Sequence, residues 1–212
     1  MEIGGWAGRL IQVGDGLFRL CTLNLLWLGF TLLGGGVFGL FPATAALYTV
    51  IRKWLREGEG VPIFSTFWRA YREGFWRLNG MMGIYALMFS ALILDFRLLA
   101  VMEGSLDWIR PILITISVIC WVSLLYLFPL VVHVRLRFFQ YMIQSVLITL
   151  ARPLESVLLA GAALLCYALF VWLPGLVPFL GGSLPALLLF VIACRTFRVL
   201  EGRGSEREEV TG

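Results

Sequence analysis

Charged side chains are scarce in this sequence. Only 14% of its 212 residues are Asp, Glu, Lys or Arg, whereas 60% are hydrophobic and the mean hydropathy is +0.90. Because an average soluble domain contains roughly 25% charged residues, the composition excludes water as the main solvent of this chain. Histidine is scarce too, since His133 is the only one. The four cysteines are far apart in the sequence and form no CxxC pair.

These absences exclude several classes of function. A metal site or an intramembrane protease needs several His, Cys, Asp or Glu side chains that converge, and the sequence has no GxxxxGK[ST] phosphate loop. No ionisable residue lies near the centre of an apolar run, although burial of such groups marks ion and proton paths. We therefore expect no enzymatic activity, no cofactor and no metal. The net charge of +4 fits membrane orientation and anionic lipid, without nucleic acid.

Five uncharged runs dominate the chain, at 20–51, 78–94, 111–134, 138–151 and 156–194. One transmembrane helix needs about 20 apolar residues, so the first and last runs are too long for a single span. Glycine at 34–36 and a Pro- and Gly-rich stretch at 174–182 favour a turn in each. We predict an all-α polytopic membrane protein with six transmembrane helices in three hairpins, at about 17–34, 42–57, 77–98, 109–134, 153–173 and 184–200.

The distribution of basic residues predicts the orientation. Cytoplasmic segments of membrane proteins are rich in Lys and Arg. If both termini are cytoplasmic, 15 of the 17 basic residues lie inside and only Arg97 and Arg110 lie outside. Residues 1–200 then form one helical membrane domain, and residues 201–212 form a flexible, charged cytoplasmic tail. In a five-helix alternative, residues 20–41 are a single span and the N-terminus lies outside.

Residues 63–77 have an amphipathic pattern. On a helix that turns about 100° per residue, the aromatic side chains gather on one side and the arginines on the other. The pattern predicts a helix at the cytoplasmic face that lies among lipid headgroups or docks a partner protein. The candidate contact residues are Phe64, Phe67, Trp68, Arg69, Tyr71 and Arg72. The run at 138–151 is too short to cross, and is either a separate inner-face helix or a continuation of the preceding span.

Two strings resemble a known family. NLLWL at 24–28 and GLFPATAALY at 39–48 look like the YesL family of small bacterial membrane proteins, and the resemblance covers residues 17–77. Members usually have Ile or Thr before their Gly-Pro, where this chain has Phe41. The family has no established biochemical activity, but its genes tend to lie beside those of carbohydrate ABC importers and glycan-degrading enzymes. The resemblance therefore implies a protein of the bacterial cell membrane with an accessory role in sugar uptake.

The polar and distinctive residues of these strings are Asn24, Trp27, Pro42 and Thr44. We expect them to pack the first two helices together or to line a cavity between them. The leading hypothesis is a non-enzymatic accessory membrane protein that associates with the permease or ATPase subunits of a carbohydrate ABC importer. The alternative is a self-sufficient channel or facilitator for small solutes. Membrane lipids are expected partners, a second copy of the chain is allowed as a partner, and nucleic acid is not expected.

Overall fold

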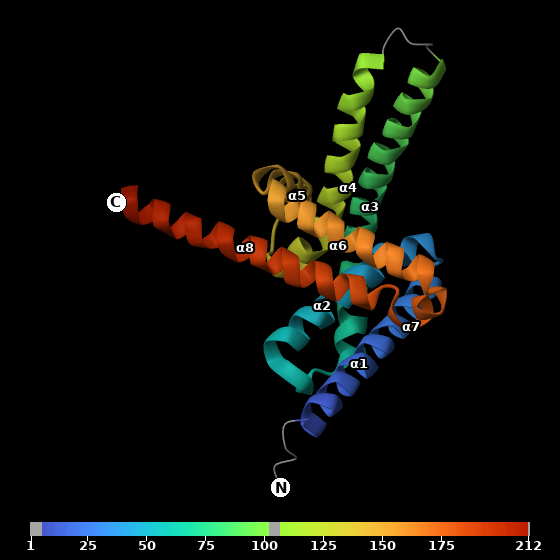
Figure 1. Ribbon diagram of the computed structural model, residues 1–212, viewed down its shortest axis with the longest axis vertical. Helices are drawn as coiled ribbons and strands as arrows, with labels where there is room; N and C mark the ends of the chain where they lie inside the picture. The colour runs from blue at the N-terminus through green and yellow to red at the C-terminus, as the bar shows by residue number, and fades with distance from the viewer. Residues whose placement is uncertain (1–5, 102–106, 212) are drawn as a thin grey trace.

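The computed structural model describes residues 6–101 and 107–211 (Figure 1). Every element in these ranges is a helix, which confirms the all-α prediction. In chain order the helices are α1 (Trp6–Leu33), α2 (Val37–Glu57), η1 (Gly58–Gly60), α3 (Ile63–Val101), η2 (Asp107–Ile109), α4 (Arg110–His133), α5 (Phe138–Ala151), α6 (Pro153–Trp172), η3 (Pro174–Leu176), α7 (Val177–Leu180) and α8 (Ser183–Thr211).

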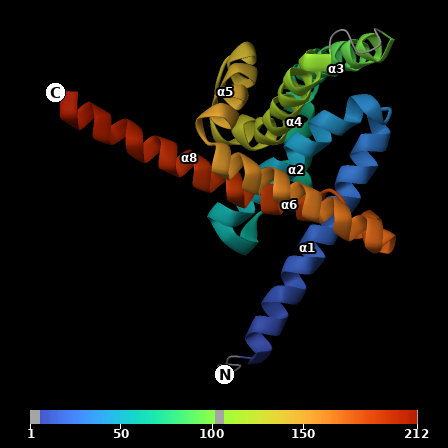
Figure 2. The ribbon, with the colours of Figure 1, turned by 45° about the horizontal axis from the view of Figure 1, so that its top comes forward.

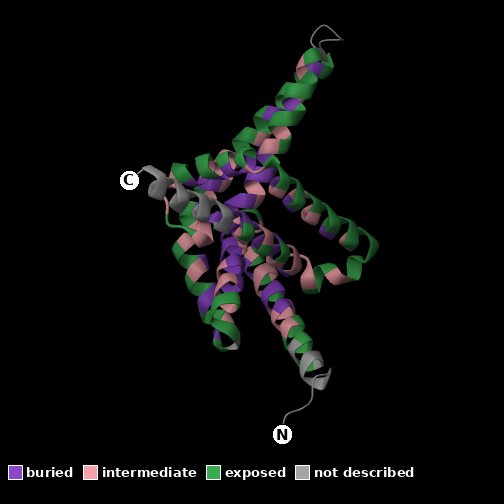
Figure 3. Cartoon of the chain, turned by 60° about the vertical axis from the view of Figure 1, so that its left-hand side comes forward, coloured by how far each residue is buried: buried purple, intermediate pink, exposed green. Residues whose placement is uncertain are grey.

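Most apolar surface of the long helices faces outward. Helices α1, α3, α4 and α6 are long and apolar enough to cross a membrane, and a fifth span results if the bent pair at 174–180 and 183–197 counts as one. Only 11–33% of the residues in the four apolar windows are buried, and exposed residues cover much of the α3–α4 arm in Figure 3. Soluble proteins rarely expose such large apolar areas. The chain is thus a membrane protein, but the structure does not confirm six spans.

The first predicted hairpin is present, with a different start for its second helix. The chain turns at the predicted glycines, where Gly35 and Gly36 have φ of 78° and 75°, a conformation that residues with a Cβ rarely adopt. Helix α2 begins at Val37, so Pro42 lies inside it and not at its first turn as we predicted. A proline this close to the N-terminus removes one helical hydrogen bond, to the carbonyl of Phe38, which the first turns tolerate.

Helix α2 fills the centre of the molecule. It packs against α1, α3, α4 and α8, and its small and branched side chains Ala43, Ala46, Val50 and Ile51 are at most 1% exposed. The uncharged run of α2 ends at residue 51, because Arg52 begins a basic C-terminal part. The predicted span 42–57 therefore corresponds to a central helix that is not among the candidate spans.

Helix α3 joins two segments that we predicted as separate. An interfacial helix at 63–77 and a span at 77–98 form one helix of 39 residues, about 58 Å long. Between Ile63 and Val101 the sequence has no proline to interrupt it. Within α3, a guanidinium nitrogen of Arg77 donates to the carbonyl of Leu136 at 2.9 Å, and the guanidinium carbon lies 4.5 Å from the centre of the Tyr141 ring. Arg77 thus fastens α3 to the junction between α4 and α5.

The run at 138–151 is a separate helix, α5, so the alternative of a continued fourth span is excluded. The Tyr141 hydroxyl stabilises the turn between α4 and α5. It donates to the carbonyl of Val134 at 2.8 Å and accepts from the N–H of Leu136 at 2.9 Å. Farther along α5, the hydroxyls of Tyr85 and Ser145 lie 3.2 Å apart. These bonds satisfy polar groups that water would otherwise have to reach.

The second predicted break also appears in the structure. Helix α6 ends at Trp172 and α8 begins at Ser183, with η3 and α7 between them, and the two helical parts 174–180 and 183–197 meet at 68°. Helices α6 and α8 lie side by side (Figure 2). Helix α8 continues to Thr211 and so includes most of the predicted tail at 201–212. The flexibility of that tail stays a prediction.

We predict that Gly34→Ala destabilises the α1–α2 hairpin. A Cβ at this position would overlap the Cα of Gly39 and lie 2.5 Å from the Tyr71 hydroxyl, and such overpacking costs about 1–3 kcal/mol. Thermal unfolding in detergent, monitored by circular dichroism, should show a lower midpoint for Gly34→Ala than for the wild type. Gly29→Ala is the matched control because nothing lies within 4 Å of its Cβ. Equal midpoints for the two variants would contradict the prediction.

Candidate functional site

Asn24 of α1 makes four hydrogen bonds to the break between α7 and α8. Its amide nitrogen donates to the carbonyls of Val177 at 3.2 Å and Pro178 at 2.7 Å. Its side-chain oxygen accepts from the N–H groups of Gly182 at 2.7 Å and Ser183 at 3.2 Å. An Asn side chain has two donors and two acceptor lone pairs, so its capacity is filled, and it is 0% exposed.

These bonds explain how a broken helix is tolerated among apolar spans. The break ends the helical hydrogen bonding of α7 and leaves the first N–H groups of α8 without helical partners, although the carbonyl of Val177 still accepts from the N–H of Gly181 at 2.9 Å. Hydrocarbon offers no water to pair with them, so irregular backbone is stable only where protein satisfies it. Asn24 supplies that pairing from another helix, and it fixes the position of α8 relative to α1.

Trp27, one turn after Asn24, links three elements. Its indole N–H donates to the hydroxyl of Thr44 at 3.1 Å, and that hydroxyl donates to the carbonyl of Leu40 in its own helix at 2.7 Å. Its ring covers Gly182, where a Cβ would lie 2.9 Å from the indole carbons. The structure therefore brings Asn24, Trp27 and Thr44 together around Gly182. Pro42 is buried in α2 and has no part in these hydrogen bonds.

The aromatic side of residues 63–77 is divided between the protein interior and the surface. Phe67 and Tyr71 are buried, and their ring centres lie 5.2 and 5.1 Å from that of Phe30 in α1. The Tyr71 hydroxyl also donates to the carbonyl of Phe30 at 3.1 Å. These two residues are internal anchors, so a role in direct contact with lipid or a partner, as we predicted for them, does not fit.

The contact of Tyr71 with the α1–α2 turn also bears on the predicted number of spans. Tyr71 lies six residues before Arg77, about 9 Å along α3, and a Cβ on Gly34 would touch the Tyr71 hydroxyl. Six spans require Gly34 and Arg77 to lie on opposite sides of a hydrocarbon core about 30 Å thick. The contact instead brings Gly34 close to the Tyr71 part of α3, so the structure does not confirm the six-span arrangement.

The surface of α3 carries a stripe of large side chains. Phe64, Trp68, Arg72 and Trp76 recur every fourth residue and therefore follow one side of the helix. All four are exposed, Phe64 by 62%, Trp68 by 45% and Trp76 by 84%. Arg69 is exposed beside them. We call Phe64, Trp68, Arg72 and Trp76 the α3 stripe. Trp76 was missing from the predicted contact residues, although its spacing from Trp68 and Arg72 could have identified it.

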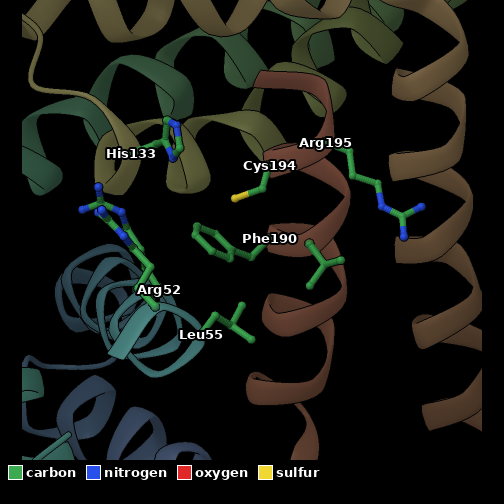
Figure 4. A pocket seen from close by; sticks show the side chains of 8 residues that line it. Arg52, Leu55, His133, Phe190, Cys194 and Arg195 are labelled. Carbon is green, nitrogen blue, oxygen red and sulfur yellow. The ribbon is translucent and has the colours of Figure 1, made fainter. Parts of the chain in front are cut away.

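A basic cleft lies where α2, α4 and α8 meet, with a volume of about 620 Å³ (Figure 4). Arg52 projects from α2 toward the end of α4, where His133 lies, and Phe190 and Cys194 face them from α8. The lining residues are Arg52, Leu55, Arg56, His133, Phe190, Val191, Cys194 and Arg195. Sequence reasoning missed this cleft because its arginines come from segments far apart in the chain.

The buried polar side chains in the described part of the chain are neutral. They are Asn24, Thr66, Ser123, Ser145, Thr149, Ser156, Ser183 and Thr196. Groups of three or more His, Cys, Asp or Glu side chains that could hold a metal ion are also absent from the described residues. Among the described residues, the buried polar side chains are thus uncharged, and the partly buried Arg152 pairs with Glu155 at 3.1 Å.

Comparisons with known proteins find a family and three relatives that this chain resembles. The profile described as "Protein of unknown function, DUF624" matches residues 20–96. The chain is 34% identical to the uncharacterized protein YteU of Bacillus subtilis (strain 168), over 97% of this chain and 93% of YteU. It is 37% identical to YesV of the same strain, over 89% and 91%, and 32% identical to YesL, over 93% and 97%. No solved structure matches the chain.

We predict that Asn24→Ala lowers the free energy of unfolding by about 2 kcal/mol or more. The substitution removes the Asn24 partner of the Pro178 carbonyl and of the N–H groups of Gly182 and Ser183, whereas the Val177 carbonyl keeps the N–H of Gly181. One unpaired buried group costs about 1–3 kcal/mol. Thermal unfolding in detergent measures the loss. Thr22→Val is the control, since the Thr22 hydroxyl bonds only within its own helix, to Phe18. A midpoint no lower than that of the control would refute this role of Asn24.

Proposed function

This chain belongs to the DUF624 family of proteins of unknown function, together with YesL, and we propose that it is a non-enzymatic accessory subunit of a carbohydrate ABC importer in the bacterial cell membrane. The observation that carries the proposal is the α3 stripe. Trp and Arg are the residue types most enriched among binding hot spots, and here two tryptophans and an arginine lie exposed on a single helix face.

The stripe is supported by contacts with α1, since the rings of Phe64 and Trp68 lie 6.3 and 5.5 Å from that of Phe30. Its helix is anchored from behind by Phe67 and Tyr71, which pack on Phe30. Side chains that are already fixed in place lose less conformational entropy when a partner covers them. The stripe is therefore suited to dock a membrane subunit, for example the permease of an importer.

The interior supports an accessory role over independent transport. Transporters often use the free carbonyls of a broken helix to hold a coupling ion. In this chain the carbonyls of Val177 and Pro178 already accept the amide of Asn24. The energy for solute movement then has to come from another subunit.

We further propose that both termini lie in the cytoplasm. Three contacts between basic segments support a single basic side. Arg19 of α1 lies over the ring of Trp54 near the end of α2, at 5.8 Å, Arg77 bonds the α4–α5 junction, and arginines of α2 and α8 line one cleft with His133. Positively charged segments remain preferentially on the cytoplasmic side.

Labelling of single cysteines tests this orientation. In a background with Cys21, Cys120, Cys166 and Cys194 replaced by serine, a membrane-impermeant maleimide should label Gly175→Cys in intact cells, because this exposed position has nothing within 4 Å of its Cβ. Ser65→Cys, at an exposed site on the basic part of α3, should react only after permeabilisation. The reverse pattern would place the termini outside.

Affinity purification tests the accessory role. Tagged protein is isolated in mild detergent from the native bacterium, and co-purifying proteins are quantified against a tag-only control. We expect the permease and ATPase subunits of a carbohydrate importer with the wild type. Trp68→Ala/Arg72→Ala should reduce their recovery tenfold or more, because loss of one hot-spot side chain costs at least about 2 kcal/mol.

The matched control is Trp121→Ala/Arg97→Ala, which removes an exposed tryptophan and an exposed arginine outside the stripe. It should retain the importer subunits. Recovery of the chain alone, also when it is extracted in native nanodiscs, would refute the proposal. Equal losses in both double variants would show that the stripe is not the docking surface.

A further inference from the structure

The basic cleft concentrates positive charge in a confined space. Arg52 and Arg56 both line it and are four residues apart on α2, so they neighbour each other on one helix face. An arginine side chain carries one positive charge and five N–H donors, and it has no acceptor. Arg195 lines the cleft from α8 and extends on the side of that helix away from Arg52 (Figure 4). Two neighbouring cations of α2 therefore line the cleft, and a third, from α8, extends away from them.

The charge is not neutralised within the described part of the chain. Neither Arg52 nor Arg56 has a carboxylate within 4.0 Å there, whereas Arg152, on α6, pairs with Glu155 at 3.1 Å. Like charges four residues apart destabilise a helix. Arg56, in the last turn of α2, gains some stabilisation from the helix dipole, but Arg52 lies a full turn earlier and gains less. An anion between the two side chains would stabilise both.

Apart from the arginines and His133, the residues that line the cleft are apolar. Leu55 of α2 and Phe190, Val191 and Cys194 of α8 line it beside the arginines. A ligand that fits has a compact anionic end for the guanidinium groups and an uncharged remainder for these walls. Arginine binds phosphate through two parallel hydrogen bonds, a geometry that its planar fork favours.

We propose that the basic cleft binds a phosphate group, held by Arg52 and Arg56. The phosphate belongs either to the headgroup of an anionic phospholipid or to a soluble phosphorylated molecule. Both sources share the anion and its contacts with the two arginines. They differ in whether acyl chains extend from it along the exposed apolar helices into the bilayer.

The test uses the purified full chain in neutral maltoside detergent. Inorganic phosphate replaces chloride at constant ionic strength, and the unfolding midpoint is recorded, since a ligand that binds the folded state raises it. The midpoint of the wild type should rise with phosphate. Arg52→Gln/Arg56→Gln should weaken the apparent affinity at least tenfold, and Arg52→Lys, which keeps the charge without the fork, should weaken it less. Lys53→Gln/Arg97→Gln removes the same charge outside the cleft and should behave like the wild type.

A second arm identifies the source of the phosphate. The protein is placed in nanodiscs of phosphatidylcholine with or without phosphatidylglycerol, and the lipids that it retains are identified by native mass spectrometry. Retention of phosphatidylglycerol that is lost in Arg52→Gln/Arg56→Gln indicates a lipid site. A response to phosphate without such retention indicates a soluble ligand. An equal response in all variants, or no response in either arm, overturns the proposal. If the double variant does not fold, a wild-type affinity in Arg52→Lys overturns it as well.

Discussion

The pairing of the helix break with Asn24 determines how the centre of this protein is assembled. Hydrocarbon contains no water to satisfy the backbone between α7 and α8, so the partner has to come from the protein. Because Asn24 lies on α1, the pairing also sets α1 against α8. Trp27 then reaches both Gly182 and Thr44, which holds α2 between the two helices. One amide side chain thereby specifies the relative positions of three helices.

This arrangement separates a neutral interior from charged surfaces. The hydrogen bonds inside the bundle join hydroxyl, amide and backbone groups, for example Tyr85 with Ser123 and Ser145. Such groups connect helices without the large desolvation cost of buried ions. Positive charge is found instead on the exposed part of α3 and in the cleft between α2, α4 and α8. These charged surfaces are therefore the places at which we propose recognition, and the hydrogen bonds of the interior keep them in position.

Local signals in the sequence are sufficient for the helices and their breaks. Glycine at 34–36 and prolines at 174 and 178 interrupt helices through their own backbone preferences, and both turns occur where they predict. The partner of Asn24 is 153 residues away at Val177, and no local pattern connects them. The sequence shows an amide side chain in the first span and a Pro- and Gly-rich break at 174–182. Several other polar residues in the spans could equally have paired with the backbone of that break.

Which aromatic side chains of α3 are buried could not be predicted, for a related reason. The period of residues 63–77 correctly identifies a helix with an aromatic side, but lipid and the apolar surface of another helix are equally apolar. Periodicity therefore cannot decide whether Phe67 and Tyr71 meet lipid or Phe30. The same ambiguity affects α2, whose small side chains permit close packing while its length resembles that of a span.

The two cationic surfaces differ in what they can bind. The α3 stripe has one arginine among three aromatic side chains, and the carboxylate of Glu73 is exposed on the same helix. Its charges face open surroundings, where salt screens them within about 10 Å, so affinity there depends on the buried area of the tryptophans. Arg52 and Arg56 lie in a cleft with apolar walls, where a lower local dielectric strengthens their attraction for an anion. The stripe is therefore suited to a protein surface and the cleft to a small phosphate.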